Sequence, residues 1–249
     1  SRSRNCRGMI VDNGKQAGKE RLTMSELTSA LLYFPYLYYD KKEPFPVKLV
    51  GYHIFRYTGK SLSFDREIVV DRQKVDYVIE YAIYFDYDIQ HMYDLEHIWI
   101  YVGKDGTVVD AECSSHGRFL NCWRYRPIAE DGRRITLYSQ PGKHAFFPEG
   151  NLFLLFSDYE EVCGEKAGAD GLLIPPQLKG LAAGKASVNE QIRRKIQEEF
   201  AFRPSLEFEK REIPERCFLP EEELFPAIAE RIHEMLEKLE RQNREERMG

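Results

Sequence analysis

The sequence predicts a mainly β fold with α: an antiparallel β-sandwich, preceded by a short N-terminal helix and followed by a helical C-terminal extension. Apolar residues alternate with a period of two through much of residues 46–157, as they do in half-buried strands. Aromatic residues make up 13% of the chain and gather in the same runs. Helical patterns are clear only towards the two ends. The 249 residues suffice for one main domain with its own core.

The N-terminal segment, residues 1–45, contains one helix signal. Thr23 and Glu26 have the spacing of a capping box, in which each side chain satisfies a backbone N–H of the first turn. Apolar residues follow on one side of the expected helix, and Pro35 should end it. We therefore expect one short helix before the sandwich.

Residues 46–157 should form the sandwich core. The alternation is clearest over residues 47–57 and 75–86. The turn sequences GKDG at 103–106 and EDGRR at 130–134 lie between apolar runs, and both favour antiparallel hairpins.

Two further segments are expected after the core. Residues 158–186 are rich in Gly and Ala and should form an irregular loop over the sheet. Residues 187–249 should form helices packed on the core, the first with a capping box from Ser187 to Glu190. A longer helix should start after Pro220, and packing on the protein's own sheet or on a partner or membrane would explain its apolar stripe. That stripe comprises Leu224, Ile228, Ile232, Met235 and Leu239.

Composition argues against several classes of protein. The 36 Lys and Arg face 41 Asp and Glu, so no overall basic field would attract nucleic acid. Because no 18-residue apolar run is present, and because the first residues carry charge without a hydrophobic signal core, we expect a soluble chain without a transmembrane segment. Five cysteines without a C-x-x-C pair indicate neither a zinc ribbon nor a full disulfide framework, and their pairing stays open.

The candidate site lies in 88-DIQHMYDLEHIWIYVGKDG-106. On a strand Asp94 and Glu96 share a face, and His91 can join them only if the chain bends before the strand. Two neighbouring carboxylates at the rim of an apolar layer repel each other and lose hydration, which a divalent cation or basic partners would offset. A fourth ligand could come from Asp86 or Asp88, at the end of the preceding strand.

One imidazole among several carboxylates suits Mg²⁺, Ca²⁺ or Mn²⁺ better than structural Zn²⁺. The alternative is a set of solvated acids at a junction between loop and strand. A second polar feature is the turn that holds Lys143 and His144, bounded by Pro141 and Pro148. These side chains could meet an anionic substrate or add an imidazole to the cation pocket, or His144 could simply bond to the backbone of its turn.

The runs YAIYFDYD, HMYDLEHIWIYV and AECSSHGRF resemble the necrosis- and ethylene-inducing peptide-like proteins. These are secreted cytolysins with the hallmark G-H-R-H-D-W-E, followed by a strand and a Ser/Ala-His-Gly segment. The resemblance extends from roughly residue 77 to residue 119 and implies a β-sandwich. In this resemblance His91, Asp94 and Glu96 correspond to the family's cation ligands, and Asp88 (or else Asp86) corresponds to its further acidic ligand. His116 corresponds to the family's downstream histidine near the pocket.

The resemblance also implies what the site recognises. Family members bind a sphingolipid head group beside the cation, so we expect a divalent cation and a polar ligand such as a sugar or lipid head group. It further implies secretion. Four hallmark residues differ, which implies a divergent, non-toxin member; they are replaced by Gln90, Met92, Tyr93 and Leu95.

Two other hypotheses remain. One is a metal-dependent hydrolase, in which the cation activates water and His116 or His144 shuttles a proton. The sequence has no G-x-S-x-G motif that would support such an enzyme independently. The other is a structural domain whose acids bind nothing. The oligomeric state is left open.

Overall fold

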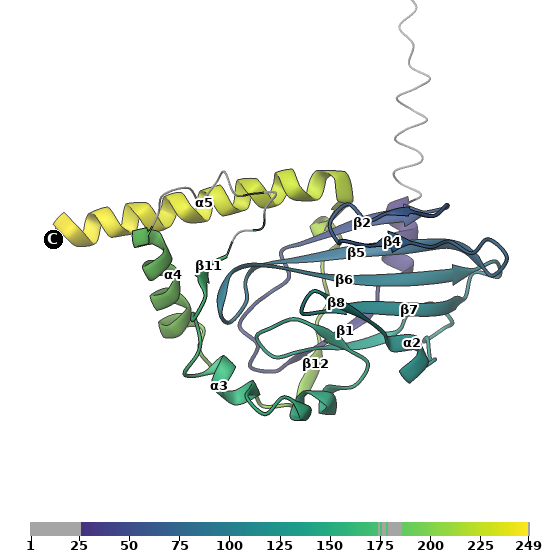
Figure 1. The fold of residues 1–249 in the computed structure, drawn as a ribbon, viewed down its shortest axis with the longest axis horizontal. Coiled ribbons are helices and arrows are strands. Elements are labelled where there is room, and N and C mark those ends of the chain that lie inside the picture. Colours follow the sequence, from purple (N-terminus) through teal and green to yellow (C-terminus); the bar gives the residue numbers. More distant parts are fainter. Residues whose placement is uncertain (1–25, 174, 176–177, 179–185, 249) are drawn as a thin grey trace, which may run out of the picture.

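The computed structural model describes residues 26–173, 175, 178 and 186–248. It shows a β-sandwich with helices, so the predicted fold class is confirmed (Figure 1). The first described helix covers residues 26–33 and ends before Pro35, as predicted. Thr23, and with it the expected capping box, lies outside the described residues.

The large sheet has the order β13-β2-β5-β6-β7-β8, with β11 also paired to β6. Most neighbours are antiparallel, but β11 and β13 pair in parallel with β6 and β2. The strands are β2 (Leu49–Phe55), β5 (Val75–Tyr87), β6 (His91–Gly103), β7 (Val108–Ser115), β8 (Arg118–Asn121), β11 (Gly171–Leu172) and β13 (Phe218–Pro220).

The small sheet has the order β10-β9-β1-β12, and its pair β1 and β9 is parallel. Its strands are β1 (Tyr36–Asp40), β9 (Thr136–Ser139), β10 (Phe146–Phe147) and β12 (Phe208–Lys210). A separate ribbon joins β3 (Gly59–Lys60) to β4 (Glu67–Ile68). Buried side chains of both sheets form one core, including Leu37, Leu137 and Phe146 from the small sheet and Ile83 and Ile100 from the large one.

The sandwich takes in more of the chain than the predicted core of residues 46–157. Strands β1, β12 and β13 lie outside these bounds, and the last two interrupt the segment predicted to be helical. Each is at most five residues long. Runs this short give too few periods for alternation to be recognised.

The two predicted hairpin turns have different outcomes. GKDG joins β6 to β7 as expected, and Gly106 takes the positive φ of 78° that the turn requires. EDGRR is closed by an isolated antiparallel bridge between Glu130 and Arg134. It does not connect two paired strands, because the preceding residues form α2 (Cys122–Tyr125) and β9 pairs with β1. Asn121 caps α2 through a hydrogen bond from the Arg124 backbone N–H.

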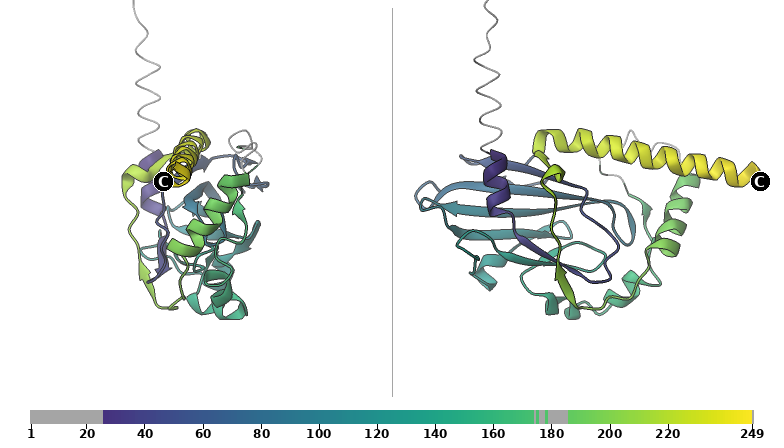
Figure 2. Two further views of the ribbon diagram at one scale, coloured as in Figure 1. Left: turned by 90° about the vertical axis from the view of Figure 1, so that its left-hand side faces the viewer. Right: turned by 180° about the vertical axis from the view of Figure 1, so that it is seen from behind.

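The helical extension consists of α4 (Ala186–Glu199) and α5 (Glu221–Met248), which Figure 2 shows from two further sides. α4 already begins before Ser187, whose side chain is not described. The stripe of α5 packs on the protein's own sheet, with Leu224, Ile228 and Ile232 fully buried, so the packing prediction is confirmed. Leu236 is buried more deeply than the predicted Met235.

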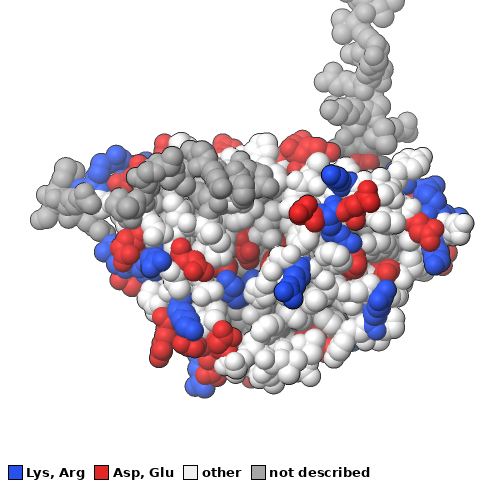
Figure 3. Space-filling view, viewed as in Figure 1, with Lys and Arg blue, Asp and Glu red and all other residues white. Residues whose placement is uncertain are grey.

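Shorter elements occupy the connections. The predicted irregular loop, residues 158–186, contains α3 (Tyr159–Cys163) and β11 where it is described. The remaining short helices are η1 (Gly150–Leu155) and η3 (Glu215–Cys217). Cys113, Cys122, Cys163 and Cys217 are free thiols. No helix of the described segments is both long and apolar enough to cross a membrane. On the face drawn in Figure 3, acidic and basic side chains are interspersed.

Candidate functional site

The candidate site lies beside β6, between the residues that pair with β11 and those that pair with β7. Towards its start β6 pairs with β11 at His91 and Met92, and its pairing with β7 begins only at Ile98. Between these pairings a cavity of about 520 Å³ opens, large enough for a small ligand. It is lined by Ser63, Phe64, Asp88, His91, Tyr93, Asp94, Leu95, Glu96, His97, His116, Gly117, Lys143, Leu173 and Pro175.

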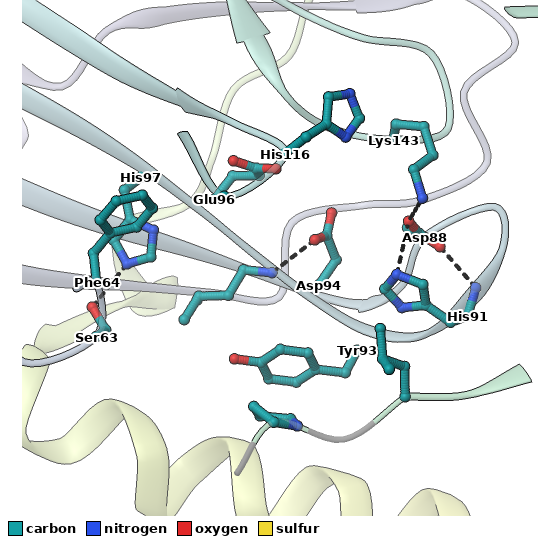
Figure 4. Close-up of a pocket in the computed structure, with 14 residues that line it drawn as sticks. Ser63, Phe64, Asp88, His91, Tyr93, Asp94, Glu96, His97, His116 and Lys143 are labelled. Atoms are coloured by element: carbon teal, nitrogen blue, oxygen red, sulfur yellow. Dashed lines mark hydrogen bonds and ion pairs between the residues drawn. The ribbon is translucent and has the colours of Figure 1, made fainter. Parts of the chain in front are cut away.

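The structure thus brings most of the predicted site residues together. Asp88, His91, Asp94, Glu96 and His116 all line this cavity. In Figure 4 Asp88 and His91 lie at one end with Lys143, and Ser63, Phe64 and His97 lie at the other. Asp94 and Glu96 lie between the two groups.

Asp88 closes the hairpin between β5 and β6. Its Oδ1 accepts hydrogen bonds from the backbone N–H groups of Gln90 and His91, both at 2.7 Å. Its Oδ2 forms an ion pair with Lys143 Nζ and lies 3.2 Å from His91 Nε2. Only 1% of Asp88 is exposed, so this carboxylate depends on these partners for the solvation it has lost.

The bend that His91 needs is found at Tyr93, inside the strand. Tyr93 has a φ of 78°, and the regular pairing of β5 with β6 is interrupted there. The next residue, Asp94, accepts hydrogen bonds from the Leu95 N–H at 3.0 Å and from His144 Nδ1 at 2.7 Å. Both of its oxygens therefore have protein partners.

His144 is fully buried and does not line the cavity. Its ring stacks on Phe85 with centroids 3.8 Å apart, and its Nε2 lies 3.5 Å from Glu43 Oε1. The imidazole therefore sits between two carboxylates, those of Glu43 and Asp94. From the protein interior, His144 therefore holds the carboxylate of Asp94 in place, and it cannot contact a ligand in the cavity.

Lys143 and His144 belong to what we call the basic turn, residues 140–145. The turn is fastened to the Asp88 hairpin, since Gly142 accepts a hydrogen bond from the Ile89 N–H at 2.7 Å and donates one to Glu43 Oε2 at 2.6 Å. Gly142 has a φ of 69°, and a Cβ there would come within 2.8 Å of Ile89 Cβ. Glycine is therefore needed for the basic turn to approach the acids.

The charges of this cluster shift three pKa values. Burial lowers the pKa of His144, but the hydrogen bonds and charges of Asp94 and Glu43 outweigh it and raise the pKa to about 9. Burial raises the pKa of Asp94, but His144, with His91 and Lys143, outweighs it and holds the pKa below its usual value. Burial and the neighbouring charge of Asp94 raise the pKa of Glu96 to about 8, despite its hydrogen bond from Ser114. At neutral pH Asp94 is ionised and Glu96 is largely protonated.

The remaining histidines divide between the rim and the interior. His116 is exposed at the rim, with Nε2 at 2.8 Å from Gln140 Oε1. The ring of His97 stacks parallel to Trp99, and its Nε2 lies 2.8 Å from Ser63 Oγ. Burial lowers the pKa of His97 to about 4, so it is neutral at physiological pH.

Sequence reasoning did not identify Ser63, Phe64 or Glu43 as part of the site. Ser63 and Phe64 come from the connection between β3 and β4, and Glu43 precedes β2. None of them lies in a recognisable motif. Only their position in the fold reveals their role.

Asp86, the alternative acidic ligand, is placed elsewhere. Its carboxylate accepts two hydrogen bonds from Arg231 of α5, at 3.0 and 2.8 Å, and Lys48 Nζ lies 3.7 Å away. Asp86 and Asp88 are separated by one residue, but Asp88 turns into the cavity and Asp86 faces α5. Asp86 therefore fastens the helix instead of joining the site.

Substituting Arg231 by Met should lower the free energy of unfolding by about 1 kcal/mol, because a two-point, partly buried pair between α5 and β5 is lost. Urea unfolding measures this change. Lys238→Met removes a charge from an exposed position of the same helix and serves as the control. Equal losses in the two variants would contradict the role assigned to Asp86.

The donor chemistry of the cavity suits a hard divalent cation, but the arrangement does not fit one. Asp88 Oδ2 is paired with Lys143, and Asp94 Oδ2 is bonded to His144. Across the described segments, no group of three or more His, Cys, Asp or Glu side chains is placed to hold a metal ion. Basic partners, one of the two options for offsetting the repulsion between the acids, are present in the structure.

Comparison of the chain with protein-family models, with curated proteins and with solved structures finds no match.

Proposed function

We propose that this protein binds a polar ligand, a sugar or a lipid head group, in the cavity beside β6. The observation that carries the proposal is the lining itself: carboxyl groups, imidazoles and an ammonium group share one cavity of about 520 Å³ with the rings of Phe64 and Tyr93. Polar groups that converge beside aromatic rings suit a ligand with hydroxyl groups and an apolar face. The resemblance to necrosis-inducing-like proteins, which bind a head group, supports the same class of ligand.

Two parts of the sequence-based hypothesis stay predictions. Binding of Mg²⁺, Ca²⁺ or Mn²⁺ would require Asp88 and Asp94 to leave their basic partners. Metal-dependent hydrolysis would require a proton shuttle at the cavity. His116 lines the cavity and His144 does not, so His116 is the remaining candidate. Assays of phosphatase, esterase and glycosidase turnover with and without chelator test the enzyme hypothesis.

The binding proposal can be tested with two sets of probes. Calorimetry with free hexoses and inositol phosphates tests the sugar, and sedimentation with phosphatidylcholine vesicles, with and without a glycosphingolipid, tests the lipid head group. We expect Glu96→Gln to weaken binding roughly tenfold, because the largely protonated carboxyl group, which offers one O–H donor, is replaced by an amide group with two N–H donors.

The control is Asp158→Asn, an exposed acid away from the cavity. It should leave binding unchanged. If no probe binds, or if Glu96→Gln and Asp158→Asn behave alike, the cavity is not a site for this class of ligand.

A further inference from the structure

Four acidic side chains meet positive charge from a single segment of chain. Glu43, Asp88, Asp94 and Glu96 come from three separate places in the sequence, whereas the opposing charges belong to two consecutive residues of the basic turn. Lys143 contacts Asp88, and its charge also acts on Asp94 and Glu96. His144 bridges Asp94 and Glu43. The basic turn thus supplies compensation that the sequence had led us to expect from a metal ion.

We propose that Lys143 is a built-in cation, which takes the place of a divalent metal ion among these carboxylates and makes the site independent of metal. The ammonium group and a metal ion would compete for the same oxygen, Asp88 Oδ2. The ammonium group has the advantage of being tethered, since the basic turn is already fastened to the Asp88 hairpin through Ile89 and Gly142. A tethered charge loses less freedom on pairing than a free ion does.

Lysine suits this role for two further reasons. Its ammonium group is compact and has three donors that can be directed at oxygens on different sides, much as a small cation attracts several oxygens. It is also nearly withdrawn from solvent, with 13% of its side chain exposed against 2% for that of Asp88. In such a place the pair is screened little by salt, and removing the ammonium group would leave a buried charge without compensation.

The test is Lys143→Met, which keeps the length of the side chain and removes its charge. We expect the wild-type protein to show the same melting temperature in chelator and in millimolar Ca²⁺, Mg²⁺ or Mn²⁺. Lys143→Met should melt lower in chelator, and at least one of these ions should restore its stability and bind roughly tenfold or more tightly than to the wild type. Lys41→Met breaks the exposed pair with Glu207 and should gain no affinity for ions.

The double variant Asp88→Asn with Lys143→Met separates a cation site from general damage. The amide oxygen of the introduced asparagine can still accept the two backbone hydrogen bonds of the hairpin, so this variant should fold, and it should not respond to the ions. Should Lys143→Met fold only when an ion is added, the proposal is supported. It is overturned if the wild type binds an ion tightly, if folded Lys143→Met gains no ion affinity, or if no ion restores its folding.

These measurements need no knowledge of the ligand, so they stand even if the binding proposal of the previous section fails. Only the expectation that ligand binding needs no metal rests on the proposed function. Where a sugar or vesicle probe binds, the wild type should bind it equally well in chelator and in Ca²⁺. A requirement for Ca²⁺ would refute metal independence while leaving the binding function intact.

Discussion

Replacing His144 with Asn should lower the free energy of unfolding by about 3–5 kcal/mol, because it leaves the buried carboxylate of Glu43 and the largely buried carboxylate of Asp94 without their shared positive partner. Asn is chosen because it tolerates the φ of 58° at this position better than most residues. The effect is measured by urea unfolding at neutral pH. A second estimate agrees: a folded pKa of about 9 against an ordinary value of 6.5 corresponds to about 3 kcal/mol.

The matched control is His116→Asn. His116 also has a positive φ, 51°, but it is exposed and bonded to the neutral Gln140, so the loss should stay below about 1 kcal/mol. Because the folded pKa of His144 is raised, its stabilising contribution is complete below pH 6.5 and disappears as the pH rises through about 9. The variant should lack this alkaline decline. Equal, small losses at both histidines would contradict the buried ion-pair assignment.

Glu221→Gln, in contrast, should raise the free energy of unfolding in alkaline solution. Glu221 begins α5, is 1% exposed and lies beside the carboxyl group of Glu80. Burial and the charge of Glu80 raise its pKa from 4.5 to about 9, although Ser63 donates a hydrogen bond to it. A helix N-terminus favours a negative charge by only about 0.3–1 kcal/mol, so burial dominates.

Since the folded pKa is raised, the wild type loses stability as the pH rises from 4.5 to about 9. Gln cannot ionise, so the variant should match the wild type near pH 4.5 and exceed it at pH 9 by on the order of 6 kcal/mol. Part of the slope should remain, because His144 and Glu96 still titrate. Glu222→Gln, at an exposed neighbouring position, should change stability by less than about 0.5 kcal/mol at any pH. If the free energy of unfolding of Glu221→Gln falls with pH as steeply as that of the wild type, the raised pKa assigned to Glu221 is wrong.

Much of this fold could be predicted from local patterns. The long runs of β2, β5 and β6 alternate over enough residues to be recognised, and α5 carries its apolar stripe over several turns. The short strands β1, β12 and β13 could not be predicted, because they become strands only through their partners. Strand β12 has just three residues, and only its register with β1 defines it. Tertiary pairing decides such cases, not propensity.

The sequence predicted many of the residues that meet at the cavity, but not their contacts. The spacing of Asp94 and Glu96 identified one strand face, and His91 required a bend that the structure has at Tyr93. The partner of each acid could not be read from spacing, since Lys143 and His144 follow about 50 residues later and reach the acids through the fold. Spacing alone did not separate Asp86 from Asp88, although the resemblance placed Asp88 first. Arg231, on a distant helix, accounts for the difference between them.

The placement of β12 and β13 has a consequence for the order in which the protein can form during synthesis. These strands, within residues 208–220, cover one edge of each sheet by pairing with β1 and β2, which were synthesised much earlier. Until the ribosome has released them, both edges present unpaired backbone groups and can pair with other chains. Sheet closure is therefore a late, long-range step, and a nascent or truncated chain should need a chaperone more than the finished protein does.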